Sequence, residues 1–268
     1  STAGTGGFSN RNASVGAYDS VAIDIIITVF MLLFSINFAV YFLILTKKWR
    51  DALASDELRF FLSVVAAATA VLTFANLGVY SGVWESLRYA SFQVASIIST
   101  TGFGTADFVL WPQFSQLIIV LIMFCGASAG STGGGMKCSR VLILLRSIRR
   151  EVHRITHPRS VEVVKLDGKL VSEATLHTLL VFLGAYVITV FAAALVISLD
   201  GQSFAVSFSA ALTCVSNVGP GLEAIGPSGN FAAFSGLSKG VMSLCMIVGR
   251  LEIFPILVLL SPSTWRRT

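Results

Sequence analysis

Charged side chains are scarce in this chain, because Asp, Glu, Lys and Arg make up only 12% of its 268 residues. Apolar residues make up 54%, and the mean hydropathy is +0.80. A soluble globular domain needs more polar surface, so the composition excludes that class and indicates an integral membrane protein. Five apolar runs each reach the roughly 20 residues that a helix needs to cross a bilayer. We expect membrane spans at 21–45, 60–80, 114–145, 173–199 and 234–260.

Cysteine and histidine are also few, which limits the chemistry open to the chain. The cysteines fall in or beside apolar runs without the spacing of metal ligands, so we interpret them as apolar packing residues. No cluster of Cys and carboxylate side chains surrounds any histidine. We therefore expect no enzyme site and no cofactor bound by this chain. The residues concerned are Cys125, Cys138, Cys214, Cys245, His153, His157 and His177.

The basic residues concentrate in every second connection between the apolar runs. The positive-inside rule places these connections and the C-terminus in the cytoplasm. Beside a membrane span, the basic run at 146–159 is expected to contact anionic lipid headgroups or a cytosolic partner, not nucleic acid. The predicted cytoplasmic residues are Lys47, Lys48, Arg50, Arg59, Arg146, Arg149, Arg150, Arg154, Arg159, Lys165, Lys169, Arg266 and Arg267.

A Thr/Gly string, STTGFGT at 99–105, recurs in altered form at 1–8 and 216–221. Two of these strings follow short apolar helices that we predict at 84–98 and 203–215, inside outward connections too long to be simple turns. Glycine tolerates positive φ and leaves its carbonyl unshielded, so such strings can turn backbone oxygens toward a cation. Non-helical backbone persists at membrane depth only inside protein or beside a water-filled cavity. The pattern predicts an all-α membrane protein with repeated units of helix, pore helix, filter loop and helix.

The third apolar run is interrupted by GASAGSTGGG at 126–135. Each glycine inside a helix costs about 1 kcal/mol relative to alanine, so the run should break here. One alternative is that the small residues only permit close helix packing. Another is a phosphate-binding loop, but GSTGGGMK lacks the required spacing because Cys138 follows Lys137.

Three further charges lie in apolar surroundings. Arg250 and Glu252 fall deep in the last run, where an unpaired charge facing lipid costs about 2.5 to 3.5 kcal/mol. A surface pair between them is an alternative, although residues i and i+2 do not share a helix face. Lys137 either adds a positive charge below the filter or extends to the cytoplasmic interface. We expect Asp24 to make a structural hydrogen bond.

In these strings and this topology, the chain resembles the Trk/Ktr/HKT superfamily of potassium transporters, and most of all its bacterial TrkH/TrkG branch. The resemblance implies four repeats in a longer polypeptide, of which this chain would be the C-terminal part. The end of the second repeat would be residues 1–59, the third repeat 60–170 and the fourth 171–268. The filter glycines would be Gly7, Gly102 and Gly219. The fourth string departs from the third at Asn217 and Val218, which implies an asymmetric filter.

The resemblance also implies a function, namely gated, channel-like potassium uptake across the bacterial inner membrane. Filter carbonyls would bind potassium, and an intramembrane loop beneath them would block the pore, with Arg250 against it and hydroxyls of Ser128, Ser131 and Thr132 facing the pathway. The implied partners are a second copy of the chain and a cytosolic ring of nucleotide-binding regulatory subunits. An alternating-access secondary carrier and a non-conducting assembly subunit are the alternatives. The predicted filter is Thr5, Gly6, Gly7, Thr100, Thr101, Gly102, Asn217, Val218 and Gly219, and the predicted gate is Gly126, Ser128, Gly130, Ser131, Thr132, Gly133, Gly134, Gly135, Lys137 and Arg250.

Overall fold

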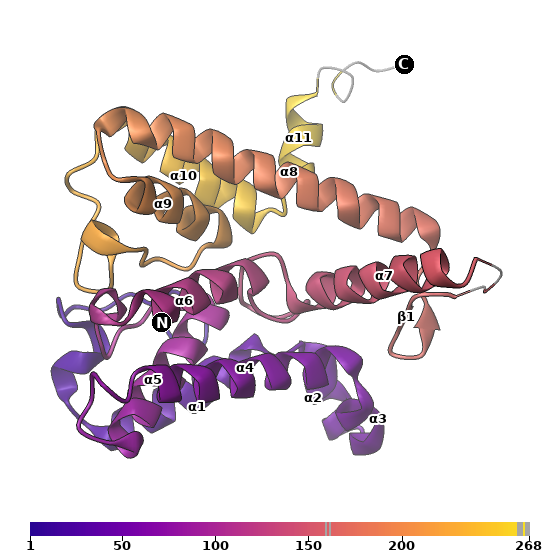
Figure 1. Ribbon diagram of the computed structural model, residues 1–268, viewed down its shortest axis with the longest axis horizontal. Coiled ribbons are helices and arrows are strands. Elements are labelled where there is room, and N and C mark those ends of the chain that lie inside the picture. Colours follow the sequence, from indigo (N-terminus) through magenta and orange to yellow (C-terminus); the bar gives the residue numbers. More distant parts are fainter. Residues whose placement is uncertain (159, 161, 262–264, 266–268) are drawn as a thin grey trace.

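The computed structural model is predominantly helical and describes residues 1–158, 160, 162–261 and 265 (Figure 1). The predicted cytoplasmic residues Arg159, Arg266 and Arg267 lie outside this part of the chain. The α-helices are α1 (Val21–Ser35), α2 (Phe38–Leu45), α3 (Trp49–Ala54), α4 (Asp56–Ala75), α5 (Val83–Ile98), α6 (Gln113–Cys125), α7 (Cys138–Thr156), α8 (Glu173–Ile197), α9 (Phe204–Ser216), α10 (Gly236–Arg250) and α11 (Phe254–Leu260). Short 3-10 turns lie at Ser14–Tyr18, Phe108–Leu110, Ser198–Asp200 and Glu223–Ile225, and strands β1 (Lys165–Leu166) and β2 (Lys169–Leu170) form a hairpin.

Two of the described helices are long and apolar enough to cross a membrane, Asp56–Ala75 and Glu173–Asp200. A third span results if α1 and α2, which are bent by 91° at a short break, count as one. Helices α6 and α9 are apolar but shorter. The predicted runs at 60–80 and 173–199 therefore correspond to continuous helices, whereas the other three runs are broken.

The sequence indicates the break in the third run but not the one in the last run. The third run is interrupted at 126–137, where the glycines predict it. The last run, predicted as a membrane span, also stops at Arg250 and resumes at Phe254, so it is not one continuous helix. Glu252 and Ile253 have φ of 58° and 61°, a conformation that a helix cannot contain. Pro255 stands in the first turn of α11 and, lacking an N–H, cannot continue α10.

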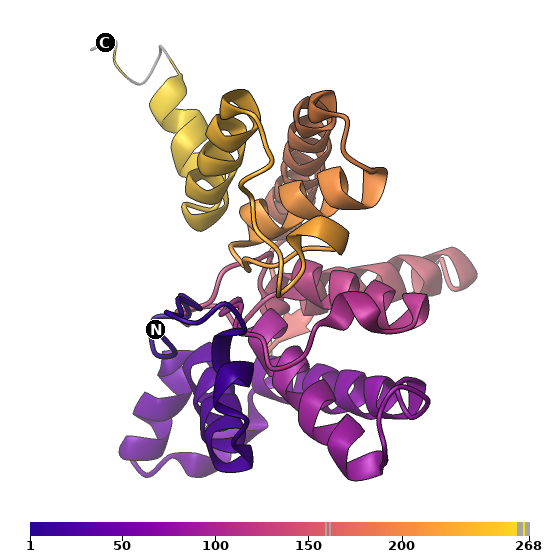
Figure 2. The same ribbon diagram turned by 90° about the vertical axis from the view of Figure 1, so that its left-hand side faces the viewer.

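The helices form packed groups joined through α6 (Figure 1). Helix α5 packs on α1 and α4, while α9 packs on α8 and α10. Helix α6 contacts both groups, and the largest apolar core cluster extends through this junction. Figure 2 shows that the segments between helices, drawn from distant parts of the sequence, meet near the middle of the molecule.

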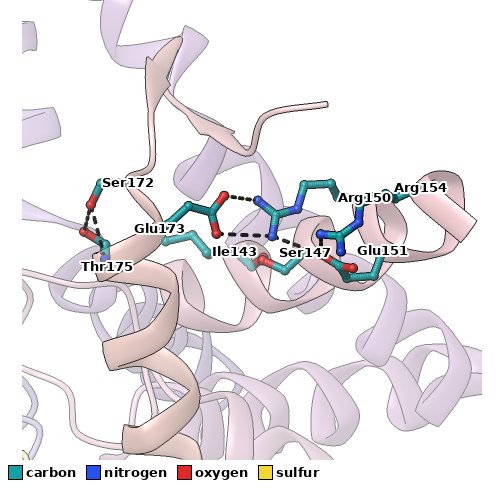
Figure 3. Close-up of polar contacts among 8 residues, drawn as sticks. All are labelled: Ile143, Ser147, Arg150, Glu151, Arg154, Ser172, Glu173 and Thr175. Atoms are coloured by element: carbon teal, nitrogen blue, oxygen red, sulfur yellow. Dashed lines mark hydrogen bonds and ion pairs between the residues drawn. The ribbon is translucent and has the colours of Figure 1, made fainter. Parts of the chain in front are cut away.

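Ion pairs join the two groups away from that meeting point. Arg150, near the end of α7, donates to Glu173 at the start of α8 with Nη1–Oε1 2.6 Å, and also to Glu151 (Figure 3). The hydrogen bond from the guanidinium to Glu173 raises the pKa of Arg150, so the pair stays charged. Arg146 similarly binds Asp56 at the start of α4, with a distance of 2.8 Å. These contacts connect the middle and the C-terminal part of α7 to α4 and to α8.

Candidate functional site

The three predicted filter strings share one backbone conformation. Thr5, Thr100 and Asn217 have φ of 47°, 57° and 57°, and two residues later the glycines Gly7, Gly102 and Gly219 have φ of 60°, 83° and 115°. Positive φ is uncommon for threonine and is costly outside glycine and asparagine. Its recurrence at the same offset in three distant segments shows that the local geometry is common to all three.

The backbone amides of the strings repeat a hydrogen-bond pattern as well. The amide of the first residue donates to the carbonyl three residues earlier, at Thr2, Ile97 and Cys214. The amide of the second residue donates to the carbonyl five residues earlier, at Ser1, Ser96 and Thr213. The N–H groups of the strings are thus directed back toward the segments that precede them, which for two strings are helices α5 and α9.

A hydroxyl six residues before each glycine supports the same turn, and this feature was missed in the sequence analysis. Thr213 Oγ1 accepts from the Gly219 amide at 2.8 Å, and Ser1 Oγ accepts from the Phe8 amide at 2.8 Å. Ser96 Oγ donates to Phe103 O at 2.6 Å. The signal was present in the sequence, because Ser1, Ser96 and Thr213 stand at one fixed distance from Gly7, Gly102 and Gly219.

The string carbonyls are left without protein donors. Within the described residues, no backbone or side-chain donor hydrogen-bonds to the carbonyl oxygens of the nine predicted filter residues. The strings also lie against one another. A Cβ atom on Gly7 would lie 1.9 Å from Thr101 O, and one on Gly102 would lie 2.2 Å from Val218 O. Only glycine fits at these two positions, and the carbonyls that would meet a side chain belong to the neighbouring strings.

A cavity of about 370 Å³ opens beside the strings. It is bordered by all three strings and by the end of α10. Helices α5 and α9 end at their strings, so their C-terminal carbonyl dipoles favour positive charge there. Its lining residues are Gly4, Thr5, Gly6, Phe8, Thr100, Thr101, Thr213, Cys214, Asn217, Val218, Gly219, Met246 and Arg250.

The Gly-rich segment at 126–135 forms a loop that contacts the strings directly. The Gly134 amide donates to Thr100 Oγ1 at 2.7 Å, and Thr5 Oγ1 donates to Thr132 O at 2.9 Å. A Cβ atom on Gly134 would lie 2.5 Å from Ser216 O, at the end of α9. The third apolar run therefore returns to the centre of the molecule at its break, and the contacts require glycine.

Two cationic side chains bind carbonyl oxygens of this loop. Arg250 Nη1 donates to Thr132 O at 2.9 Å, and Lys137 Nζ donates to Gly133 O at 2.6 Å. Lys137 therefore folds back onto the loop and does not extend away from it. The alternative of a pair between Arg250 and Glu252 is wrong, because Glu252 binds Arg140 with an Nη2–Oε2 distance of 2.5 Å.

The loop hydroxyls that the resemblance places on an ion pathway make contacts that the structure describes. Ser131 Oγ donates to Ser128 O at 2.6 Å, and Thr132 Oγ1 donates to Phe34 O at 3.2 Å. The Ser128 hydroxyl is buried and has no partner in the described part of the chain. None of the three residues borders the 370 Å³ cavity. The loop presents backbone and bound cations near the strings, and two of its three hydroxyls, those of Ser131 and Thr132, donate to protein carbonyls.

Asp24 makes the polar contact that the sequence predicts, but with a charged partner. Its Oδ2 lies 2.8 Å from Arg88 on α5, and both side chains are largely buried. The pair fixes α1 against the helix that supports the 99–105 string. No group of three or more His, Cys, Asp or Glu residues suited to a metal ion occurs among the described residues.

Comparison with known proteins places these features in a family. The family model described as TrkH, cation transport protein, matches residues 1–266. The "Trk system potassium uptake protein TrkH" of Salmonella typhimurium is 36% identical over 275 residues, which cover 99% of this chain and 55% of that protein. The "Trk system potassium uptake protein TrkG" of Escherichia coli is 31% identical over 269 residues, which cover 99% of this chain and 55% of that protein. The crystal structure of the potassium transporter TrkH from Vibrio parahaemolyticus is 33% identical, with a TM-score of 0.88 over 99% of this chain and 57% of that one.

Proposed function

Because this chain belongs to the TrkH family of cation transport proteins, and so is a multi-pass membrane protein, we propose that the complete protein takes up potassium as a gated, channel-like pore. The chain spans about half the length of the curated relatives it matches, so residues beyond it would complete the pore. The observation that carries the proposal is a set of three strings that share one backbone geometry and border a cavity. Their carbonyls accept no hydrogen bond from any residue that the structure describes. Carbonyl oxygens in such a ring replace the hydration shell of a cation.

The repeat organisation follows from the same proposal. Residues 1–59, 60–170 and 171–268 would each contribute one string, with pore helices α5 and α9 pointing their carbonyl ends at the ion. Asn217 and Val218 replace the two threonines of the third string. Asn217 Nδ2 donates to Met246 O at 3.2 Å, so this string is tied to α10 as well as to α9. The filter would be asymmetric for that reason.

The Gly-rich loop would act as the gate of this pore. Its contacts with Thr5 and Thr100 favour a position directly beneath the filter. Arg250 and Lys137, bound to the loop carbonyls, would raise the electrostatic barrier to a cation. Opening would require the loop and these two cations to move away together.

The setting follows from the charge pattern and from the family. The protein would lie in the bacterial inner membrane with its basic loops and C-terminus in the cytoplasm. It would form a homodimer and bind a cytosolic ring of nucleotide-binding regulatory subunits through the basic segments near 47–59 and 146–169. Nucleotide would bind the ring, and the only ligand of this chain would be potassium.

The test is rubidium-86 uptake into proteoliposomes that contain the complete protein, with wild type compared with Arg250→Ala. We expect faster uptake in the variant, blocked by potassium more than by sodium or lithium. Unchanged or abolished uptake would remove Arg250 from the barrier. Strict coupling to protons or sodium would favour the alternating-access carrier, and absence of flux from the active wild-type complex would favour the assembly subunit.

A further inference from the structure

The middle of the Gly-rich loop, residues 128–132, rests on the bend between α1 and α2. The Ser128 amide donates to Ser35 O at 3.0 Å, and Thr132 Oγ1 donates to Phe34 O at 3.2 Å. In the opposite direction, the Phe38 amide donates to Gly130 O at 3.1 Å. A straight helix would use these carbonyls and this amide internally, so the 91° bend is what makes them available to the loop.

Glu57, on helix α4, contacts both the bend and the loop. It is the second residue of α4 and is only 6% exposed. Its Oε1 accepts from the Ala129 amide at 2.6 Å, and its Oε2 accepts from Asn37 Nδ2 at 3.4 Å. Asn37 in turn caps α2 by accepting from the Ala39 amide. One carboxylate therefore binds both the loop backbone and the residue at the bend.

The burial of Glu57 needs an explanation, because a buried carboxylate is costly unless it is paired or hydrogen-bonded. No ion pair involves Glu57 within the described ranges of the chain. Its polar partners are instead the loop amide and the bend side chain. Gly130 of the loop also lies close to the bend, since a Cβ atom on it would lie 3.1 Å from Asn37 Oδ1.

We infer that Glu57 is a positioning residue of the gate, whose carboxylate holds the Gly-rich loop in its blocking position on the bend between α1 and α2. The inference rests on the proposed function in one respect, that this loop blocks the pore. Helix α4 follows α3 directly, with Ser55 ending one helix and preceding the other. A displacement of α3 at the membrane surface would thus move Glu57 and release the loop.

The experiment separates loop position from conduction. Ala129→Cys in the complete protein reports loop release through its rate of reaction with a small cationic methanethiosulfonate, above the background of the buried native cysteines. Rubidium-86 uptake is measured on the same preparations. Glu57→Leu removes the acceptor at similar size, whereas Glu57→Gln retains one acceptor oxygen. Asp51→Asn, an exposed acidic residue on α3 with no described side-chain bond, is the matched control.

We expect Glu57→Leu to raise the labelling rate and the uptake at least about tenfold, because it removes the oxygen that accepts from the loop amide of Ala129. Glu57→Gln should stay near wild type, and Asp51→Asn should match it. Should Glu57→Leu fail to fold, Glu57→Asp takes its place, because it withdraws the oxygens by one carbon atom. Unchanged labelling in a folded variant would overturn the inference. Raised labelling with unchanged uptake would support the role of Glu57 in positioning the loop, and it would overturn the proposal that the loop is the gate.

Discussion

At the scale of single residues, the site depends on places where only glycine fits. Gly102 combines φ of 83° with a Cβ position 2.2 Å from Val218 O. An alanine there would have to push the 217–219 string aside and also adopt a strained backbone. The carbonyl that it would displace is one of those left without a protein donor.

Gly102→Ala should therefore lower rubidium-86 uptake by at least about tenfold while the protein still assembles. The matched control is Gly184→Ala in α8, where a Cβ atom would meet nothing within 4 Å and where uptake should stay unchanged. Rubidium-86 uptake of both variants measures conduction, and their size-exclusion profiles show whether they assemble. If Gly102→Ala conducts like wild type, the 100–102 string does not line the ion path.

The sequence indicated these filter glycines because one part of their constraint, the backbone conformation of each string, is local. The φ pattern and the amide bonds involve residues at most six positions apart, so a recurring string reveals them. Glu57 was not found because its partner amide at Ala129 lies 72 residues away. Nothing near Glu57 in the sequence distinguishes it from an ordinary acidic residue in the first turn of a helix.

A second residue-scale feature is the buried pair of Asp24 and Arg88. Removing one partner of a buried ion pair leaves an uncompensated charge and costs about 3 to 5 kcal/mol. Arg88→Met should therefore lower the thermal unfolding midpoint clearly, measured on the complete protein in detergent. Asp24→Leu combined with Arg88→Met should recover most of that loss, since no buried charge remains. A double variant as unstable as the single one would show that packing, not charge, determines the effect.

At the scale of elements, the arrangement of the site depends on breaks within the apolar helices. The sequence predicts the break between α6 and α7, because consecutive glycines cannot sustain a helix. It does not predict the 91° bend between α1 and α2 or the end of α10 at Arg250, where the surrounding residues are mainly apolar. Those breaks are stabilised by contacts distant in sequence, such as the loop amide of Ser128 on Ser35 and the ion pair of Glu252 with Arg140.

The ends of the Gly-rich loop meet at Cys125 on α6 and Cys138 on α7, with Sγ atoms 3.5 Å apart and both thiols free. Because both thiols are buried, we use diamide, an uncharged oxidant, which should take two electrons and two protons from the pair, giving a disulfide and the reduced hydrazine. We expect the fixed loop base to slow uptake, with a thiol reductant restoring it. Peptide mass spectrometry identifies the bond, and Cys138→Ser is the control. Uptake that stays unchanged after complete oxidation would show that the loop base need not move.

At the scale of the whole molecule, the strings come from three stretches of sequence that meet at one cavity, so an ion bound there would hold separate helix groups together. A ligand that binds only the folded state stabilises it by about 2.7 kcal/mol at one hundred times its Kd. Potassium should accordingly raise the unfolding midpoint of the complete protein above that in a large organic cation at equal ionic strength. Because Gly102→Ala distorts two strings at once, it should remove this difference, whereas Gly184→Ala should retain it. Equal midpoints in both salts for wild type would mean that the strings hold no ion tightly, and the carbonyl arrangement would then need another explanation.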